Sequence, residues 1–107
     1  MNQISPTDLQ QRFNAVSTVY LLDVRERYEY EFVAFPDSYL IPLGELPLRY
    51  GEIKAWQNEE IIIYCHHGIR SQHAISFLAS VGFDLLFNLQ GGIDGWACLV
   101  DPTMPRY

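Results

Sequence analysis

The sequence of 107 residues lacks three features that mark common classes of protein: long apolar runs, an excess of basic charge and an abundance of cysteine. Its longest apolar runs, Ile61 to Cys65 and Trp96 to Val100, are far shorter than the ~20 residues that a helix needs to cross a bilayer. The 7 basic and 13 acidic side chains leave a formal net charge of −6, so a broad basic surface for phosphates is not expected. We therefore expect no membrane and no nucleic acid among its partners.

Only two cysteines, Cys65 and Cys98, are present, which is too few for a disulfide framework. The stretch from Met1 to Pro6 has neither the basic nor the apolar region of a secretory signal, so we expect a cytoplasmic protein with reduced thiols. Cys98 lies among apolar residues without a cationic neighbour, which predicts a packed and inert thiol. The length and a hydrophobic content of 49% predict a single domain over residues 1–107.

Candidate strands alternate with candidate helices along the chain. Ser5 and Pro6 form a helix start signal, and Leu9, Phe13 and Val16 then recur at helical spacing, which predicts a helix over 6–15. Apolar runs predict strands at 19–22, 39–41, 61–64 and 85–87. Further helical segments are expected at 26–32, 46–53, 71–81 and 93–97. This alternation predicts an α/β fold, in which helices cover both faces of a parallel sheet with the β-branched run 61–64 at its centre.

The segment from Cys65 to Arg70 joins the predicted central strand to the next helix. Ligands of parallel α/β sheets bind beyond the carboxyl ends of the strands, so this loop is the candidate site. Its backbone N–H groups can converge on the Cys65 sulfur, and the helix start at Ser71 and the Arg70 guanidinium favour a thiolate over a thiol. Gly68 suits a tightly curled loop, because glycine adopts a positive φ without strain. The loop therefore predicts a nucleophilic cysteine in an anion-binding nest.

This loop and several dispersed motifs make the sequence similar to a single rhodanese domain. The motifs follow the family order over nearly the whole chain: Leu21-Leu22-Asp23-Val24-Arg25-Glu26, Pro36, Ile41-Pro42-Leu43, the Cys65 to Arg70 loop, Gly82-Phe83, and Asn88 to Ile93 with Trp96. The resemblance implies a rhodanese-like fold, which is a parallel five-stranded sheet flanked by helices on both faces. It also implies that the loop cysteine carries sulfane sulfur as a persulfide.

Two other segments bear on this resemblance. From Val33 to Leu40 the chain lacks the family's usual glycine after Pro36 and the histidine before it, which leaves the geometry near the third strand open. The residues Val100 to Pro102 and Pro105 to Tyr107 are similar to the end of rhodanese modules fused to sulfur-carrier-activating enzymes. We expect the segment 101–107 to be irregular and exposed.

The resemblance implies a sulfurtransferase that works in two half-reactions. Cys65 takes sulfane sulfur from thiosulfate or a protein persulfide and passes it to a thiol or cyanide acceptor, with no cofactor and no metal. The implied catalytic residues are Cys65 and Arg70. The implied substrate-binding residues are His66, His67, Gly68, Ile69 and Ser71. The two adjacent histidines are expected to hold partial positive charge for an anionic donor, with simple solvent exposure as the alternative.

Two other functions remain open on the sequence. One is a sulfur-relay or protein-interaction module of the rhodanese type, although the intact Cys65 and Arg70 argue against an inactive module. The other is a cysteine phosphatase or arsenate reductase, which resembles a rhodanese in having a Cys…Arg anion loop. Four residues separate Cys65 from Arg70, one fewer than in the related phosphatases, which predicts a pocket sized for sulfur rather than phosphate.

Several other charged and aromatic residues are expected to have structural rather than catalytic roles. Asp23 and Arg25 follow a strand end, and we expect them to pair with each other. The remaining expectations are a solvated helix face of Glu26, Glu29 and Glu31, a core position for Trp96 and a surface position for His73.

Overall fold

The computed structural model describes residues 2–15 and 18–107. All the strand pairs are parallel, and the five strands form one sheet in the order β1-β5-β4-β2-β3. The strands are β1 (Asn2–Ile4), β2 (Tyr20–Asp23), β3 (Tyr39–Leu40), β4 (Ile61–Tyr64) and β5 (Leu86–Leu89). The predicted parallel α/β fold is therefore confirmed, with the β-branched strand β4 at the centre.

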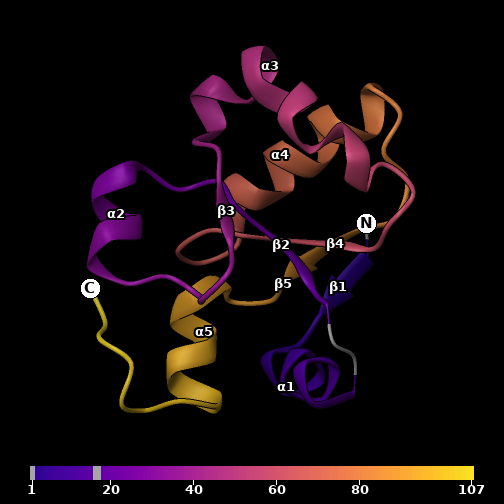
Figure 1. Ribbon diagram of the computed structural model, residues 1–107. Coiled ribbons are helices and arrows are strands. Elements are labelled where there is room, and N and C mark those ends of the chain that lie inside the picture. The colour runs from indigo at the N-terminus through magenta and orange to yellow at the C-terminus, as the bar shows by residue number, and fades with distance from the viewer. Residues whose placement is uncertain (1, 16–17) are drawn as a thin grey trace.

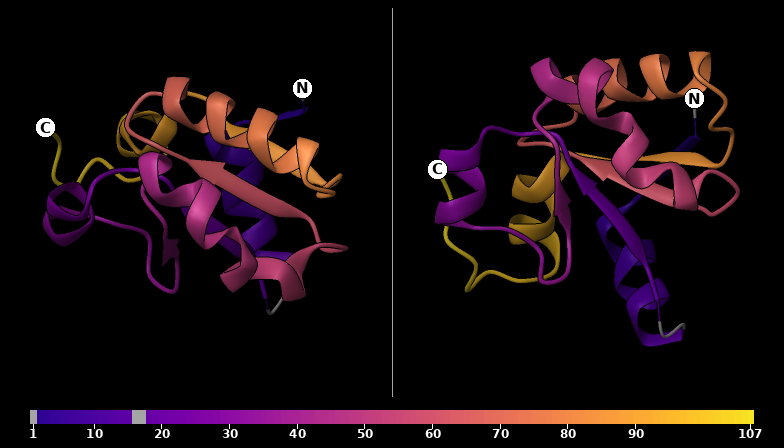
Figure 2. Two further views of the ribbon diagram at one scale, coloured as in Figure 1. Left: turned by 90° about the horizontal axis from the view of Figure 1, so that it is seen from above. Right: turned by 45° about the horizontal axis from the view of Figure 1, so that its top comes forward.

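Helical segments cover both faces of this sheet. They are α1 (Pro6–Ala15), α2 (Arg27–Phe32), η1 (Leu43–Glu45), α3 (Leu46–Arg49), η2 (Tyr50–Trp56), α4 (Ile69–Ser80) and α5 (Gly92–Leu99). In Figure 1, α1 and α5 lie below the sheet, α3 and α4 lie above it, and α2 stands at its edge. The two further views in Figure 2 show the same layering from above and from a tilted direction. Among the described residues, none of these helices is long and apolar enough to span a membrane.

Strand β4 divides the core between the two faces because its side chains alternate. Ile61 and Ile63 pack with buried residues of α3, η2 and α4, whereas Ile62 and Tyr64 pack with buried residues of α1 and α5. All four side chains are buried. A strand that is apolar on both faces fits a parallel sheet with helices on each side, and it holds the next residue, Cys65, at a fixed position.

The predicted elements and the observed ones agree closely. Helix α1 has the predicted bounds, and the Asp8 N–H donates to Ser5 Oγ at 3.1 Å, as the helix start signal requires. Helix α4 begins at Ile69, earlier than the predicted residue 71, so its first turn includes Arg70. The sequence missed β1, whose three residues include two exposed ones. Met1 and Val16 lie outside the described residues.

The segment that departs from the family pattern forms a turn without the usual glycine. Asp37 takes its place with a φ of 63°, a left-handed conformation that Asp tolerates better than most residues. Phe35 is buried, and its ring meets the edges of Tyr64 and Trp96 at centroid distances of 4.8 and 5.0 Å. Strand β3 forms at Tyr39–Leu40, within the predicted range 39–41, and pairs with β2.

Candidate active site

The Cys65 sulfur lies at the centre of the loop that leads from β4 into α4. The Gly68 N–H donates to Cys65 Sγ at 3.1 Å, and the Ser71 N–H donates to it at 3.4 Å. Ser71 Oγ also lies 3.4 Å from the sulfur. Gly68 has a φ of 111°, which turns its N–H inward and which residues other than glycine rarely adopt. The predicted convergence of backbone N–H groups on this sulfur is therefore present.

Behind the sulfur, a polar chain connects the loop to the neighbouring strands. The Ser71 hydroxyl donates to Asn88 Oδ1 on β5, and Asn88 Nδ2 donates to Gln3 Oε1 on β1 at 3.1 Å. Ser71 and Asn88 are both buried. Because buried polar groups that are fully bonded hold one geometry, this chain fixes Ser71 beside the sulfur.

Helix α5 also supports the loop, through its own N-terminus. The Ile93 N–H donates to the Cys65 carbonyl at 2.9 Å, and the Asp94 N–H donates to the His66 carbonyl at 3.1 Å. Gly92 precedes them with a φ of 63°, and a Cβ at this position would lie 2.3 Å from the His66 carbonyl oxygen. Only glycine permits this approach, so Gly92 sets the distance between α5 and the Cys65 loop.

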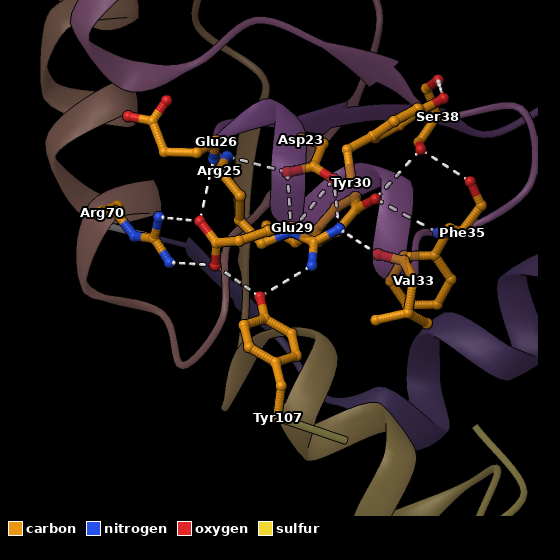
Figure 3. Close-up of polar contacts among 11 residues, drawn as sticks. Asp23, Arg25, Glu26, Glu29, Tyr30, Val33, Phe35, Ser38, Arg70 and Tyr107 are labelled. Carbon is orange, nitrogen blue, oxygen red and sulfur yellow. Dashed lines mark hydrogen bonds and ion pairs between the residues drawn. The ribbon is translucent and has the colours of Figure 1, made fainter. Parts of the chain in front are cut away.

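A set of charged and phenolic groups, here called the ionic rim, lies beside the loop; Figure 3 shows its members, Asp23, Arg25, Glu29, Arg70 and Tyr107. Arg70 donates to both oxygens of Glu29, at 2.7 and 2.9 Å. The Tyr107 hydroxyl donates to Glu29 Oε2 at 2.6 Å and accepts from Arg25 Nη1 at 2.8 Å. Arg25 in turn donates to Asp23 through Nε and Nη2, the latter at 2.7 Å. Two cations and two anions are thus joined through one phenol.

The ionic rim perturbs the protonation of its members. Burial alone would raise the pKa of Glu29, but hydrogen bonds from Arg70, Tyr107 and the Glu26 backbone lower it to about 2. Burial alone would likewise lower the pKa of Arg25, whereas its bonds to Asp23 and Tyr107 raise it. Burial and the bond to Glu29 raise the pKa of Tyr107 to about 12. Across the neutral pH range, the Glu29 carboxylate therefore stays ionised, the guanidinium groups stay protonated and the Tyr107 phenol stays neutral.

The two loop histidines have different surroundings. The His66 ring stacks flat on the Tyr107 ring, with centroids 3.8 Å apart and an interplanar angle of 5°. Burial, and then the neighbouring His67, lower the pKa of His66, a direction that opposes the expected partial positive charge on it. His67 is exposed, and its Nδ1 lies 3.8 Å from Asp94 Oδ2. Across the part of the chain that the structure describes, no three His, Cys, Asp or Glu side chains gather as a metal site.

Comparison with known proteins identifies the family. The family model described as Rhodanese-like domain matches residues 5–98. The chain belongs to the rhodanese-like domain family. The crystal structure of a rhodanese-like domain protein from Staphylococcus aureus superimposes with a TM-score of 0.84 at 26% identity, covering 100% of this chain and 99% of that one. The resemblance drawn from the sequence motifs is therefore confirmed, and so is the rhodanese-like fold.

Two curated relatives are similar over almost the whole chain. A protein of Allochromatium vinosum named sulfurtransferase is 34% identical over 97 residues, which cover 91% of this chain and 89% of the relative. The adenylyltransferase and sulfurtransferase MOCS3 of Arabidopsis thaliana is 30% identical over 120 residues, which cover 99% of this chain. This rhodanese-like domain spans only 26% of the length of that second relative.

The structure places the predicted site residues of the rhodanese-like loop in two groups. Cys65, Gly68 and Ser71 are buried, and Gly68 and Ser71 both contact the Cys65 sulfur. Ile69 is exposed beside them, and the Arg70 side chain forms its hydrogen bonds with Glu29. The expected pair of Asp23 and Arg25 is confirmed, as are the buried Trp96 and the exposed His73.

Two structural expectations were wrong. Glu29 is not part of a solvated face: it is 4% exposed, because α2 turns it toward Arg70 and Tyr107. Cys98 is exposed rather than packed, because it lies on the outer side of α5. The segment 101–107 is irregular and largely exposed, as expected, and its last residue, Tyr107, also contacts Glu29 and the His66 ring.

Several supporting residues were missed because their partners are distant in the sequence. Glu29 is 41 residues from Arg70, and Tyr107 is 82 residues from Arg25. Asn88 lies in a family motif, and a polar residue between Phe87 and Leu89 in a buried strand was the available signal for it. Gly92 carried a similar signal as the second of two adjacent glycines before a helix.

Proposed function

We propose that this rhodanese-like domain, as a single domain over residues 1–107, is a sulfurtransferase that carries sulfane sulfur as a persulfide on Cys65. The observation that carries the proposal is the convergence of the Gly68 and Ser71 N–H groups on Cys65 Sγ. Such a nest stabilises negative charge at the site that it surrounds, whether Cys65 is a thiolate or carries a persulfide anion. The family and the names of its relatives support sulfur transfer as the general chemistry.

In the first half-reaction, the Cys65 thiolate attacks the outer sulfur of thiosulfate or of a donor persulfide. The new S–S bond forms as the donor's S–S bond breaks, and sulfite or the donor thiolate leaves with the bonding electron pair. Cys65 then holds one additional sulfur that bears a negative charge. In this step, the start of α4 and the loop amides stabilise the anion.

In the second half-reaction, a nucleophilic acceptor attacks the outer sulfur of the persulfide. A thiol or cyanide forms a bond to that sulfur, and the electron pair of the broken S–S bond returns to Cys65 as a thiolate. The two half-reactions balance without an external oxidant or reductant. Neither requires a metal or an organic cofactor.

The remaining loop residues have supporting roles in this proposal. Arg70 stabilises the anionic donor and the loop from its place in the ionic rim, while the Gly68 and Ser71 N–H groups hold the Cys65 sulfur that carries the transferred atom. His66, His67 and Ile69 lie along the same loop and contact the incoming donor or acceptor. The proposed partners are thiosulfate or a protein persulfide as donor and a thiol or cyanide as acceptor, in the cytoplasm. A relay that passes sulfur to one protein uses the same persulfide and is the second candidate.

A two-substrate assay tests the proposal against the phosphatase alternative. We expect thiocyanate to form from thiosulfate and cyanide, and an aryl phosphate to stay intact, because the four-residue interval between Cys65 and Arg70 leaves a loop too narrow to place phosphorus in line with the sulfur. The variant Cys65→Ser should lose thiocyanate formation and keep the wild-type circular dichroism spectrum. Cys65-dependent hydrolysis of the aryl phosphate without thiocyanate formation would overturn the proposal.

A further inference from the structure

We propose that Tyr107 is a positioning residue for the reaction, which holds Glu29 and thereby orients the Arg70 guanidinium beside the Cys65 loop. The inference rests on the proposed sulfurtransferase function and assigns a task to a residue of the irregular segment after α5. Tyr107 reaches the ionic rim from far along the chain, since it is 78 residues from Glu29 and 82 from Arg25.

The hydrogen bonds of Glu29 show why the phenol controls Arg70. Arg70 and the Glu26 N–H donate to Oε1, while Arg70 and the Tyr107 hydroxyl donate to Oε2. The Glu26 N–H belongs to the start of α2 and holds only Oε1. Without the Tyr107 hydroxyl, Oε2 keeps Arg70 as its one partner among the described residues, and the carboxylate can rotate together with the guanidinium. The Tyr107 hydroxyl thus fixes the plane of the Glu29 carboxylate, and with it the orientation of the Arg70 guanidinium.

A phenol suits this position because it must donate and accept at once. The hydroxyl has one proton, which it gives to Glu29, and its lone pairs accept from Arg25 Nη1. Arg25 is itself immobile, since it is fully buried and bonded to Asp23 and to the Val33 carbonyl. Tyr107 therefore links the buried Arg25, just after β2, to the ion pair of Glu29 and Arg70 beside Cys65. This link holds the ion pair in a fixed position.

The aromatic ring of Tyr107 adds a second contact with the loop. It stacks on the ring of His66, the residue after Cys65. It also packs edge to face with Phe32, with the ring centroids 5.8 Å apart. The preceding Arg106 donates to both oxygens of Asp94, at 2.8 and 3.2 Å. The Asp94 N–H bonds the His66 carbonyl, so the segment is attached to both sides of the same loop residue. These contacts place the ring independently of the hydroxyl, which allows the two to be separated by mutation.

The variant Tyr107→Phe removes the hydroxyl and keeps the ring. We expect kcat/KM for thiosulfate to fall about tenfold, which corresponds to the loss of one hydrogen bond to a charged group. The loss should be mainly in KM, because Arg70 then binds the dianionic donor in several orientations. The matched control is Tyr28→Phe, at an exposed tyrosine of α2, which should leave kcat/KM unchanged.

A double-mutant cycle decides whether Tyr107 acts through Arg70. In the Arg70→Ala background, Tyr107→Phe should change kcat/KM by less than about twofold, since its target is gone. A further loss of about tenfold in that background would mean that the hydroxyl supports the loop by another route and would overturn the proposal. An unchanged kcat/KM in the single variant Tyr107→Phe would overturn it as well.

A readout without sulfur transfer separates this inference from the proposed function. Alkylation of Cys65 by the neutral reagent iodoacetamide is followed across pH by mass spectrometry of the Cys65 peptide. We expect the midpoint of this profile to move upward in Tyr107→Phe only when Arg70 is present, because a displaced guanidinium stabilises the thiolate less well. If the wild-type protein fails to transfer sulfur, the proposed function is refuted, and this profile alone decides the role of Tyr107. A wild-type midpoint in Tyr107→Phe, or a shift that persists in Arg70→Ala, would refute that role.

Discussion

The two sides of the Cys65 loop stabilise it by different means. On one side, uncharged groups surround the sulfur: the N–H groups of Gly68 and Ser71, with the N-terminus of α5 bonded to the carbonyls beneath them. On the other side, the ionic rim joins Arg25 and Arg70 to an equal number of carboxylates. Because these charges cancel, we infer that an anionic sulfur is attracted mainly by the backbone dipoles and the start of α4. Perturbing the backbone side should therefore have larger effects than perturbing the ionic side.

The largest effect is expected from Gly92→Ala on the backbone side. The added Cβ would lie 2.3 Å from the His66 carbonyl oxygen, at a φ of 63° that alanine tolerates poorly. We expect the free energy of unfolding to fall by about 3 kcal/mol or more, since neither α5 nor the loop can move without breaking hydrogen bonds. Urea denaturation measures this change.

The matched control for this variant is Gly44→Ala. A Cβ at Gly44 meets nothing within 4 Å, and its φ lies outside the left-handed region. The control should change the free energy of unfolding by less than about 1 kcal/mol. Equal losses in the two variants would show that Gly92 does not set the distance between α5 and the loop.

The next largest effect is expected from Arg70 on the ionic side. We expect Arg70→Ala to reduce kcat/KM for thiosulfate by about a hundredfold, and Arg70→Lys by about tenfold. Lysine keeps the charge but cannot bind both oxygens of Glu29 as the guanidinium does. Steady-state kinetics measure both values, and wild-type kinetics in both variants would mean that the backbone groups suffice without Arg70.

A smaller effect is expected for Glu29, whose contribution to the free energy of unfolding depends on pH. The folded-state pKa of Glu29 is lowered to about 2 from an ordinary value of 4.5, so its stabilising contribution is complete above about pH 4.5 and is lost as the pH falls toward 2. We expect this contribution to be about 2 kcal/mol, and Glu29→Gln to remove the corresponding part of the acid dependence. Urea denaturation between pH 7 and the onset of acid unfolding measures the difference.

Glu52→Gln is the control for the Glu29 experiment. The pKa of Glu52 is also lowered to about 2, by Arg49 and Tyr39, but its side chain is exposed on η2. Because solvent screens a surface pair, its removal should change the acid dependence far less than the removal of Glu29. Equal changes would contradict the conclusion that burial in the ionic rim makes Glu29 important.

Local sequence patterns were sufficient to predict most of the fold and the backbone side of the site. Apolar runs located the strands β2 to β5, and the strand-to-helix segment with Gly68 predicted the convergence of N–H groups on Cys65. Strand β1 was not predicted, because a strand of three residues, two of them exposed, has too short an apolar pattern to be recognised.

The ionic side was predicted only where its partners are close in sequence. Asp23 and Arg25 are two residues apart at a strand end, so their pairing was foreseeable. Glu29 and Tyr107 acquire their roles only when α2 and the segment after α5 are brought together in space. A carboxylate on a short helix with other acidic residues has the pattern of a solvated face, and no periodicity distinguishes the buried member.

The central claim, that Cys65 carries the sulfur, is tested most directly by mass spectrometry of the intact protein after exposure to thiosulfate and removal of excess donor. We expect the wild-type protein and Cys98→Ser to gain one sulfur atom, assigned to the Cys65 peptide, and Cys65→Ser to gain none. Addition of cyanide should remove that sulfur and return the original mass. Wild-type protein without an added sulfur, or with the sulfur on Cys98, would contradict the claim.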